Sequence, residues 1–214
     1  MRRQPLTREM VLRAALDLAD QGGLESLTMQ NIGQRLGVKA MSLYRHVANK
    51  DDILDGLVDL IVSDIDLPAS GADWKTALRQ RAISARQVFA RRRWAIGLVE
   101  SRTRPGAATL RHHESVLGVL LEAGFSSEMS AHAYNLLDSY IYGFALQEAN
   151  LPFDTPEQQA QVAQVMLQEL PADEYPNMAR VATAFIESGA DYGAEFEFGL
   201  DLILDGIERA RAEV

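Results

Sequence analysis

Apolar residues recur at helical spacing along almost the whole chain, and no strand-like alternation persists. A first helix is predicted to begin at Thr7, whose hydroxyl suits an N-cap, and to end at residues 22–23, two glycines that tolerate a helix terminus. Thr28 is expected to cap a second helix that ends at Gly37. A third helix is predicted over 39–46. The amino-terminal pattern therefore predicts three short helices in succession.

A longer fourth helix is predicted from Asn49, a good N-cap that acidic residues follow. Its apolar stripe consists of Ile53, Leu54, Leu57, Val58, Ile61 and Ile65. Residues 67–73 are the clearest linker. Further helices are predicted over 74–92, 94–101, 107–123, 127–148, 157–169, 174–188 and 193–211. The predicted fold class is all-α: a three-helix head with a helix-turn-helix, joined to a larger helical domain.

Residues 27–54 are typical of a helix-turn-helix that enters the major groove of DNA. Gly33 is expected where two helices cross closely, because it removes a side chain there. The predicted inward side chains are Ile32, Leu36, Val38, Leu43 and Val47. The residues left to contact bases or phosphates are Thr28, Gln30, Lys39, Ala40, Met41, Ser42, Tyr44, Arg45, His46 and Lys50. The alternative, a small helical hairpin with solvated charges, is disfavoured by the full spacing of the motif.

The charge distribution supports this interpretation, although the 214-residue chain carries a net charge of -9. Residues 1–50 have a net charge of +4, and the remainder has -13. Such asymmetry can mark a nucleic-acid-binding segment, and the acidic remainder should be repelled by phosphates. The chain has no cysteine, which excludes disulfides and cysteine zinc sites. It shows no signal-peptide core and no apolar run of about 18 residues, so a cytoplasmic protein with no membrane association is expected.

The chain resembles the tetracycline-repressor (TetR) family of bacterial transcriptional regulators. The residues that carry the resemblance are Leu27-Thr28, Ile32-Gly33, Leu36-Gly37-Val38, Ser42-Leu43-Tyr44, His46-Val47, Asn49-Lys50 and Ile53-Leu54. Shorter similar pieces follow at 66–74, 103–105 and 122–126. The resemblance implies a DNA-binding domain over 1–50, a connecting helix over 51–66 and a ligand-binding and dimerisation domain over 67–214.

The resemblance does not carry tetracycline over as the ligand. Family members that bind the drug through magnesium have a histidine three residues before a Thr-Arg-Pro sequence, where this chain has Glu100. They also have Asn and Phe where this chain has Arg81 and Ala85. We therefore expect no response to tetracycline, and we expect neither a metal site nor a cofactor.

Pocket candidates come from residue type and placement, since small-molecule sites combine aromatic walls with a few polar groups. They are Phe89, Trp94, Glu100, His112, His113, Tyr134, Tyr140, Phe144 and Gln147, with Tyr142 beside them. Residue by residue, the structural interpretation is favoured: Phe89 and Phe144 as core, and the two adjacent histidines as partly exposed residues without a ligand. Glu100 either faces a cavity, where it would favour a cationic ligand or pair with Arg81 or Arg104, or faces solvent. The basic run at 91–93 is typical of a solvated helix end, and a salt bridge under the head is its alternative.

Two helices are candidates for a homodimer interface, which the family resemblance also implies. The last helix has an apolar stripe on an acidic background, and helix 127–148 is apolar on more than one face. The predicted interface residues are Leu136, Leu137, Tyr140, Ile141, Phe196, Leu200, Ile203, Leu204 and Ile207. The alternative is that both helices only line the core of one subunit. A dimer would bind a palindromic operator with half-sites one DNA turn apart.

The predicted function is a homodimeric DNA-binding repressor that an unknown small-molecule effector releases from its operator. A regulator without ligand control, or an activator, is the alternative. An all-helical enzyme is the remaining class, but no nucleophile–base pattern, metal motif or phosphate loop is present, so we expect no enzyme.

Overall fold

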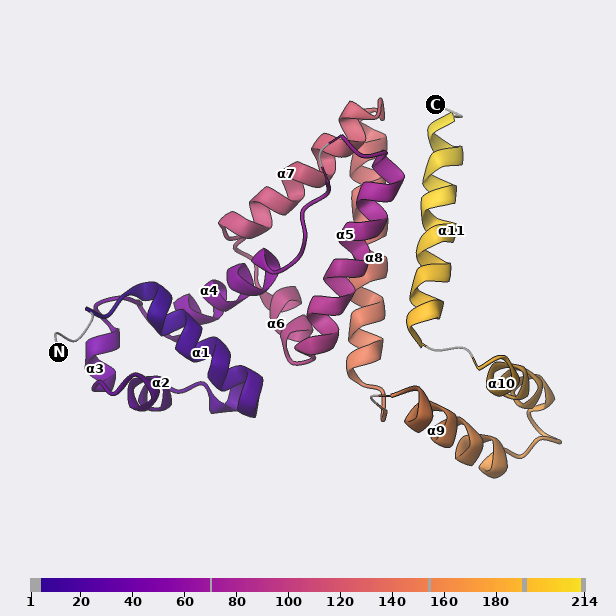
Figure 1. The fold of residues 1–214 in the computed structure, drawn as a ribbon, viewed down its shortest axis with the longest axis horizontal. Helices are drawn as coiled ribbons and strands as arrows, with labels where there is room; N and C mark the ends of the chain where they lie inside the picture. Colours follow the sequence, from indigo (N-terminus) through magenta and orange to yellow (C-terminus); the bar gives the residue numbers. More distant parts are fainter. Residues whose placement is uncertain (1–4, 70, 154, 190–191, 213–214) are drawn as a thin grey trace. The chain divides into compact units, whose positions relative to one another are not determined.

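The computed structural model describes residues 5–69, 71–153, 155–189 and 192–212, and it confirms the all-helical fold (Figure 1). The helices are α1 (Arg8–Gly22), α2 (Met29–Leu36), α3 (Ala40–Leu43), α4 (Lys50–Ser63), α5 (Trp74–Arg91), α6 (Ala95–Ser101), α7 (Ala107–Glu122), α8 (Ser127–Ala149), α9 (Pro156–Glu169), α10 (Pro176–Ser188) and α11 (Tyr192–Ala212). The described residues contain no strand. The chain divides into two compact units, Met1–Leu146 and Gln147–Val214, which are described separately.

Side-chain caps begin the helices of the head at the predicted positions. The hydroxyl of Thr7 accepts a hydrogen bond from the backbone of Met10, and the hydroxyl of Thr28 accepts one from Asn31. Asn49 caps α4 by accepting from the backbone N–H of Asp52 at 2.8 Å. Each cap satisfies a helix-terminal N–H that has no partner within its own helix.

The third helix is shorter than the predicted range of 39–46. Its regular part is Ala40–Leu43, and residues 44–46 form a turn. The carbonyl of Leu43 accepts hydrogen bonds from the backbone of both His46 and Val47, which closes the turn and brings Val47 into the core. The sequence pattern also missed a short 3-10 helix, Leu24–Ser26, which the Ser26 hydroxyl stabilises by donating to backbone carbonyls.

Two glycines fix the geometry of the helix-turn-helix. Gly37 ends α2 with a φ of 64°, a left-handed conformation that favours glycine. Gly33 lies where α2 meets the start of α3, as predicted, and a Cβ built on it would be 2.8 Å from the carbonyl oxygen of Val38. The absence of a side chain at residue 33 therefore sets how closely the two helices approach.

Helix α4 has two buried sides within the first unit. Ile53 and Leu57 belong to the hydrophobic cluster that contains the inner faces of α1 to α3. Leu98 of α6 and Ala108 of α7 belong to the same cluster, and α4 contacts α1, α6 and α7. The connecting helix thus shares one apolar core with the head and with the first helices that follow it.

The second unit contains the end of α8 and helices α9, α10 and α11. Thr155 caps α9 by accepting from the backbone of Gln158, and Gly189 ends α10 in a left-handed conformation. Helices α9 and α10 pack against each other. Proline begins both helices, at a position where its missing N–H costs no hydrogen bond.

We predict that Gly33→Ala destabilises the head by about 1–3 kcal/mol, because its new methyl group would overlap backbone atoms that cannot move freely. Gly97→Ala is the matched control, since a Cβ built on Gly97 meets nothing within 4 Å. Alanine there should be neutral or stabilising by up to about 1 kcal/mol. Urea unfolding of both variants measures the difference, and equal stability of the two would contradict the close approach at Gly33.

Candidate DNA interface and effector site

The predicted DNA-contacting residues form the outer side of the helix-turn-helix. None of the ten is buried: seven are exposed, while Ala40, Ser42 and His46 are partly buried. Met41 is the most prominent apolar member, with 76% of its surface exposed. The predicted inward residues contrast with them, because Ile32, Leu43 and Val47 are buried and Leu36 and Val38 are partly buried against the same core.

The basic residues of the head fall into two groups. Arg8 binds Asp52 at 2.7 Å, and Arg35 binds Asp17 at 3.0 Å, so these two hold helices together. Within the described chain, Lys39, Arg45 and Lys50 form no salt bridge, and all three are exposed. These three cations therefore remain available for phosphates or base edges.

The segment between α5 and α6 is tied to α1 and α4 by polar contacts. Arg92 binds Asp20 of α1 at 3.2 Å and Asp64, directly after α4, at 2.7 Å. Trp94 donates its indole N–H to the same Asp20 carboxylate at 3.0 Å. The basic run at 91–93 thus supplies a salt bridge under the head, the alternative to a solvated helix end. Trp94, predicted as a pocket residue, instead fastens this segment to the head, because its only polar atom is used by Asp20.

A second set of contacts joins α4 to α6 and α7. Arg102, directly after α6, binds Asp55 at 2.6 Å and Asp51 at 3.4 Å. Asp59 accepts a hydrogen bond from the backbone N–H of Ala108 at 2.6 Å, so a carboxylate of α4 caps the N-terminus of α7. A Cβ on Gly106 would overlap the Asp59 side chain, so a larger residue there would force that carboxylate to move.

An ion pair lies in the interior between α5 and α8. Arg81 Nη1 donates to Asp138 Oδ1 at 2.7 Å, and the two residues are only 4% and 8% exposed. Burial by itself would lower the pKa of Arg81, but the Asp138 carboxylate outweighs it and raises that pKa. Asp138 also accepts from the Tyr134 hydroxyl, and burial together with this carboxylate raises the pKa of Tyr134. Arg81 therefore does not bind Glu100, and sequence reasoning did not single out Asp138.

His112 of α7 lies close to this pair and is 4% exposed. Its ring hydrogen-bonds to the backbone of Val62 in α4. Burial and the charge of Arg81 lower the pKa of His112, so the neutral ring is favoured. The Nδ1 atom of His112 and the Nε atom of Arg81 are both buried without a hydrogen-bond partner. The adjacent-histidine interpretation, which expected partial exposure, is therefore wrong for His112.

A pocket with a volume of about 460 Å³ opens beside Asp138. It is lined by Glu100, Asn135, Asp138, Ser139, Tyr142, Gly143 and Leu146, which come from α6 and α8. Of the predicted pocket residues, Glu100 and Tyr142 line it. Its lining combines two carboxylates, an amide, a hydroxyl and one aromatic ring, and small-molecule sites use such a mixture.

The other predicted pocket residues lie around this region or apart from it. Phe89 is buried and packs edge-on against Tyr142, and His113 packs edge-on against Tyr134 at a centroid distance of 4.8 Å. Tyr140 and Phe144 are partly buried and contact each other. Gln147 is exposed and is not among the residues that line the pocket.

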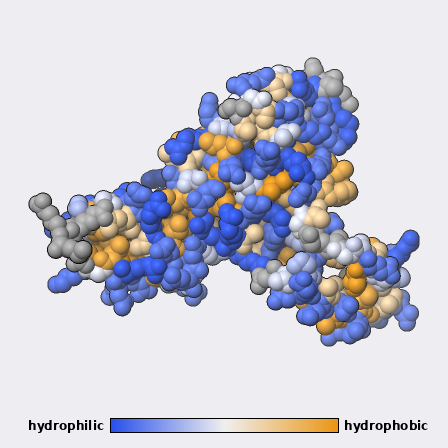
Figure 2. All heavy atoms as spheres, in the orientation of Figure 1, coloured by the Kyte–Doolittle hydropathy of each residue, from blue (hydrophilic) through white to orange (hydrophobic). Residues whose placement is uncertain are grey.

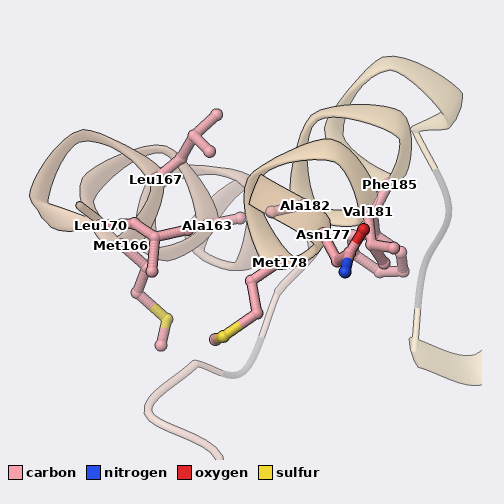
Figure 3. Close-up of a pocket in the computed structure, with 9 residues that line it drawn as sticks. All are labelled: Ala163, Met166, Leu167, Leu170, Asn177, Met178, Val181, Ala182 and Phe185. Carbon is pink, nitrogen blue, oxygen red and sulfur yellow. The ribbon is translucent and has the colours of Figure 1, made fainter. Parts of the chain in front are cut away.

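The second unit carries a separate apolar groove of about 600 Å³ between α9 and α10 (Figure 3). Its lining is Ala163, Met166, Leu167, Leu170, Asn177, Met178, Val181, Ala182 and Phe185. Hydrophobic atoms are visible on the surface of this segment in Figure 2. None of the predicted pocket residues lines it, and Asn177 is its single polar residue.

The predicted interface residues differ in how much surface they still expose. Leu137, Ile141, Phe196, Leu200, Leu204 and Ile207 are already buried in the single chain. The nine residues remain a prediction for the dimer interface. Leu136 is exposed, and Tyr140 and Ile203 are partly buried. Phe198 and Leu202 are large, apolar and exposed on α11, although the predicted stripe did not include them.

Two further features bear on the kind of site. The described residues contain no cluster of three or more His, Asp or Glu side chains arranged to hold a metal ion. Over the same residues, no helix has the length and hydropathy that a membrane span requires.

We predict that Asp138→Ala lowers the free energy of unfolding by about 3–5 kcal/mol, because it leaves the Arg81 guanidinium buried without a counter-charge. The double variant Arg81→Met, Asp138→Leu should recover most of this loss, since it removes both charges. Glu9→Ala, which breaks the exposed Arg13–Glu9 pair, should cost less than about 1 kcal/mol. Urea unfolding at one fixed protein concentration tests the series, and an equal cost for the two single variants would contradict a buried pair.

Comparison with known proteins identifies both parts of the chain. Residues 11–57 match the family described as bacterial regulatory proteins, tetR family, and residues 67–211 match the tetracyclin repressor-like C-terminal domain. The class A tetracycline repressor from Escherichia coli transposon 1721 is 33% identical over 207 residues, covering 95% of this chain and 91% of that protein. The transcriptional repressor DrrR1 of Streptomyces coeruleorubidus is 32% identical, covering 95% of this chain and 77% of its own length.

Solved structures agree with these matches. The TetR family protein ActR of Streptomyces coelicolor, in complex with actinorhodin, superimposes with a TM-score of 0.81 at 26% identity, covering 97% of this chain and 99% of that one. TetR from Acinetobacter baumannii gives a TM-score of 0.66 at 27% identity, covering 97% and 99%. The family models together span most of the chain, and they join a DNA-binding head to a ligand-binding body. The chain is a member of the TetR family of DNA-binding transcriptional regulators.

Proposed function

We propose that this regulator is a cytoplasmic repressor without catalytic activity, which binds a palindromic operator through α3 and its flanks and leaves it when a small molecule binds beside Asp138. The observation that carries the DNA-binding part is the division of the helix-turn-helix into a packed inner side and an exposed outer side. The outer side presents Lys39, Arg45 and Lys50 for phosphates or guanine, and Met41 for apolar contact with thymine.

The effector pocket has a physical connection to the head. Asp138 lines the pocket and binds Arg81, whose charge influences the neighbouring His112. His112 in turn hydrogen-bonds to the backbone of Val62 in α4. Since α4 shares its core with the recognition helices, a ligand that displaces Asp138 would change the packing that positions α3. The pocket and this connection favour ligand control over a regulator without an effector.

The proposed effector is not tetracycline. Several relatives are named as tetracycline repressors, and one solved relative holds actinorhodin instead. In this chain, Arg81 is buried in an ion pair, and Glu100 stands where the drug-binding members have a magnesium-binding histidine. A buried guanidinium and an acidic side chain give the pocket a different chemistry from that of the magnesium–drug site.

Family membership makes the regulator a dimer, and we propose which side chains remain to form its contact. Leu136 on α8 and the pair Phe198 and Leu202 on α11 are large, apolar and exposed in the single chain. Phe198 and Leu202 are four positions apart and share one face of α11, and neighbouring exposed apolar side chains of this kind mark candidate contact surfaces. Two copies joined in this way would present two recognition helices to successive turns of DNA.

We predict that Tyr44→Ala weakens operator binding by about tenfold or more, because the exposed ring and hydroxyl lie on the outer side of the head. Lys39→Ala should either relax the preference for one base pair or reduce, by about one, the slope of the logarithm of the binding constant against the logarithm of salt concentration. Bound sequences are first selected from random DNA, and affinities are then measured by fluorescence anisotropy. Arg180→Ala on α10 is the control and should bind like the wild type. Unchanged affinity in both head variants would refute the assignment of α3.

The buried His112 should make the stability of the protein depend on pH. Because burial lowers its pKa, the folded protein binds this proton more weakly than the unfolded chain. The stability that neutral His112 contributes is present above the ordinary pKa of about 6.5 and is lost as the pH falls through the lowered value. Between about pH 7.5 and about pH 5, the wild type should therefore lose more unfolding free energy than His112→Gln.

The exposed His132 provides the control for this experiment. His132→Gln should show the same pH dependence as the wild type in urea unfolding at each pH. If His112→Gln also parallels the wild type, the neutral buried ring contributes nothing to the pH dependence, and its place in the connection to α4 is wrong.

A further inference from the structure

The charges around the pocket beside Asp138 do not balance. Two carboxylates line it, those of Asp138 and Glu100. Asp138 is neutralised by Arg81 at 2.7 Å. No salt bridge to Glu100 forms within the described part of the chain. Glu100 thus lines the pocket and is exposed to solvent at the same time, and it adds one negative charge that no side chain of the lining compensates.

The basic side chain closest to Glu100 in the sequence is committed elsewhere. Arg102, two residues further on, binds both Asp55 and Asp51, and these carboxylates raise its pKa. The charge of Glu100 acts on the pocket itself, because it contributes to raising the pKa of Tyr142, which burial raises most. The Glu100 carboxylate is thus close enough to act on a charged group inside the pocket.

The rest of the lining suits a ligand with an aromatic frame and hydrogen-bonding groups. Tyr142 offers an aromatic ring, and Gly143 and Leu146 offer apolar surface. Asn135 and Ser139 can each donate and accept a hydrogen bond. The volume of about 460 Å³ lies within the range of small-molecule sites.

We infer that this pocket takes an aromatic ligand with a cationic nitrogen, and that Glu100 selects the cation. This inference rests on the proposed effector pocket and adds the chemical class of the effector. A cation in the pocket would sit between the Glu100 carboxylate and the face of Tyr142, both of which attract positive charge. An anionic ligand of the same shape would be repelled by Glu100 and would find Arg81 already bound to Asp138.

The test uses two dyes with the same ring frame and opposite charge, rhodamine 123 as the cation and fluorescein methyl ester as the anion. Binding of each to the full-length protein is followed by fluorescence anisotropy. The wild type should bind the cation at least about tenfold more tightly than the anion, and this preference should fall as salt is added.

Substitutions assign the preference to Glu100. Glu100→Gln keeps the size of the side chain and removes its charge, so the preference for the cation should fall to about threefold or less. Asn135→Asp adds a second uncompensated carboxylate to the lining and should increase the preference by a similar factor. Glu122→Gln removes a charge from an exposed position at the end of α7 and should leave the preference unchanged. Circular dichroism confirms that each variant is folded.

The outcomes separate this inference from the proposed function. Equal binding of the two dyes, a preference that survives Glu100→Gln, or no saturable binding of rhodamine 123 would each overturn the cationic class. Operator binding by the wild-type protein is measured in parallel on selected DNA. If the operator is bound but the dyes are not distinguished, only the effector class fails. If no operator is selected, the regulator itself fails, whatever the dyes do.

Discussion

The packing of α4 between two sets of helices is the constraint on which the rest of the first unit depends. This helix buries Ile53 and Leu57 in a cluster that also contains the inner faces of the recognition helices. Leu98 and Ala108, from the ligand-binding part of the chain, are members of the same cluster. Because protein interiors are closely packed, a shift on one side of α4 cannot be absorbed without a response on the other. One helix thus connects the two halves of the protein's activity.

Polar contacts also join α4 to the helices that follow the head. Asp55 and Asp59 of α4 hold Arg102 and the N-terminus of α7, and Asp64, directly after α4, holds Arg92. Each of these carboxylates is fixed by partners from the helices that follow the head. The acidic residues of the connecting helix are therefore structural, although composition alone suggested only a body that repels DNA.

The buried Arg81–Asp138 pair lies between α4 and the candidate ligand pocket in the chain of contacts. A buried ion pair contributes little net stability compared with apolar residues of similar size, so its presence needs another explanation. Asp138 faces the pocket, and Arg81 lies near His112, which reaches the backbone of α4. A ligand that competes for Asp138 would take the counter-charge away from the buried Arg81 guanidinium. This arrangement suits a two-state response better than it suits stability.

Most of the fold could be predicted from local sequence signals, because they depend on neighbouring residues only. The caps at Thr7, Thr28 and Asn49 and the close approach at Gly33 are of this kind. The Arg81–Asp138 pair could not be predicted, since its partners are 57 positions apart and lie on different helices.

The roles of Trp94 and of the apolar residues on α11 also depend on partners that are distant in the sequence and could not be predicted from it. From the sequence alone, Trp94 could line a pocket or hold two helices together. Its hydrogen bond to Asp20 shows that it does the second. For α11, periodicity identified an apolar stripe but not which side a second subunit covers. Four residues of the stripe are buried and Ile203 is partly buried, while Phe198 and Leu202 are exposed on the same helix.

We propose that α4 transmits ligand binding to the DNA-binding head. The coupling between the two sites can be measured as the ratio of operator dissociation constants with and without a saturating compound from a release screen. Asp59→Ala removes the carboxylate that joins α4 to α7 and should reduce this ratio by about fivefold or more, while the compound still binds the DNA-free protein. An unchanged ratio in Asp59→Ala would show that ligand binding is not transmitted to the head through the contact between α4 and α7.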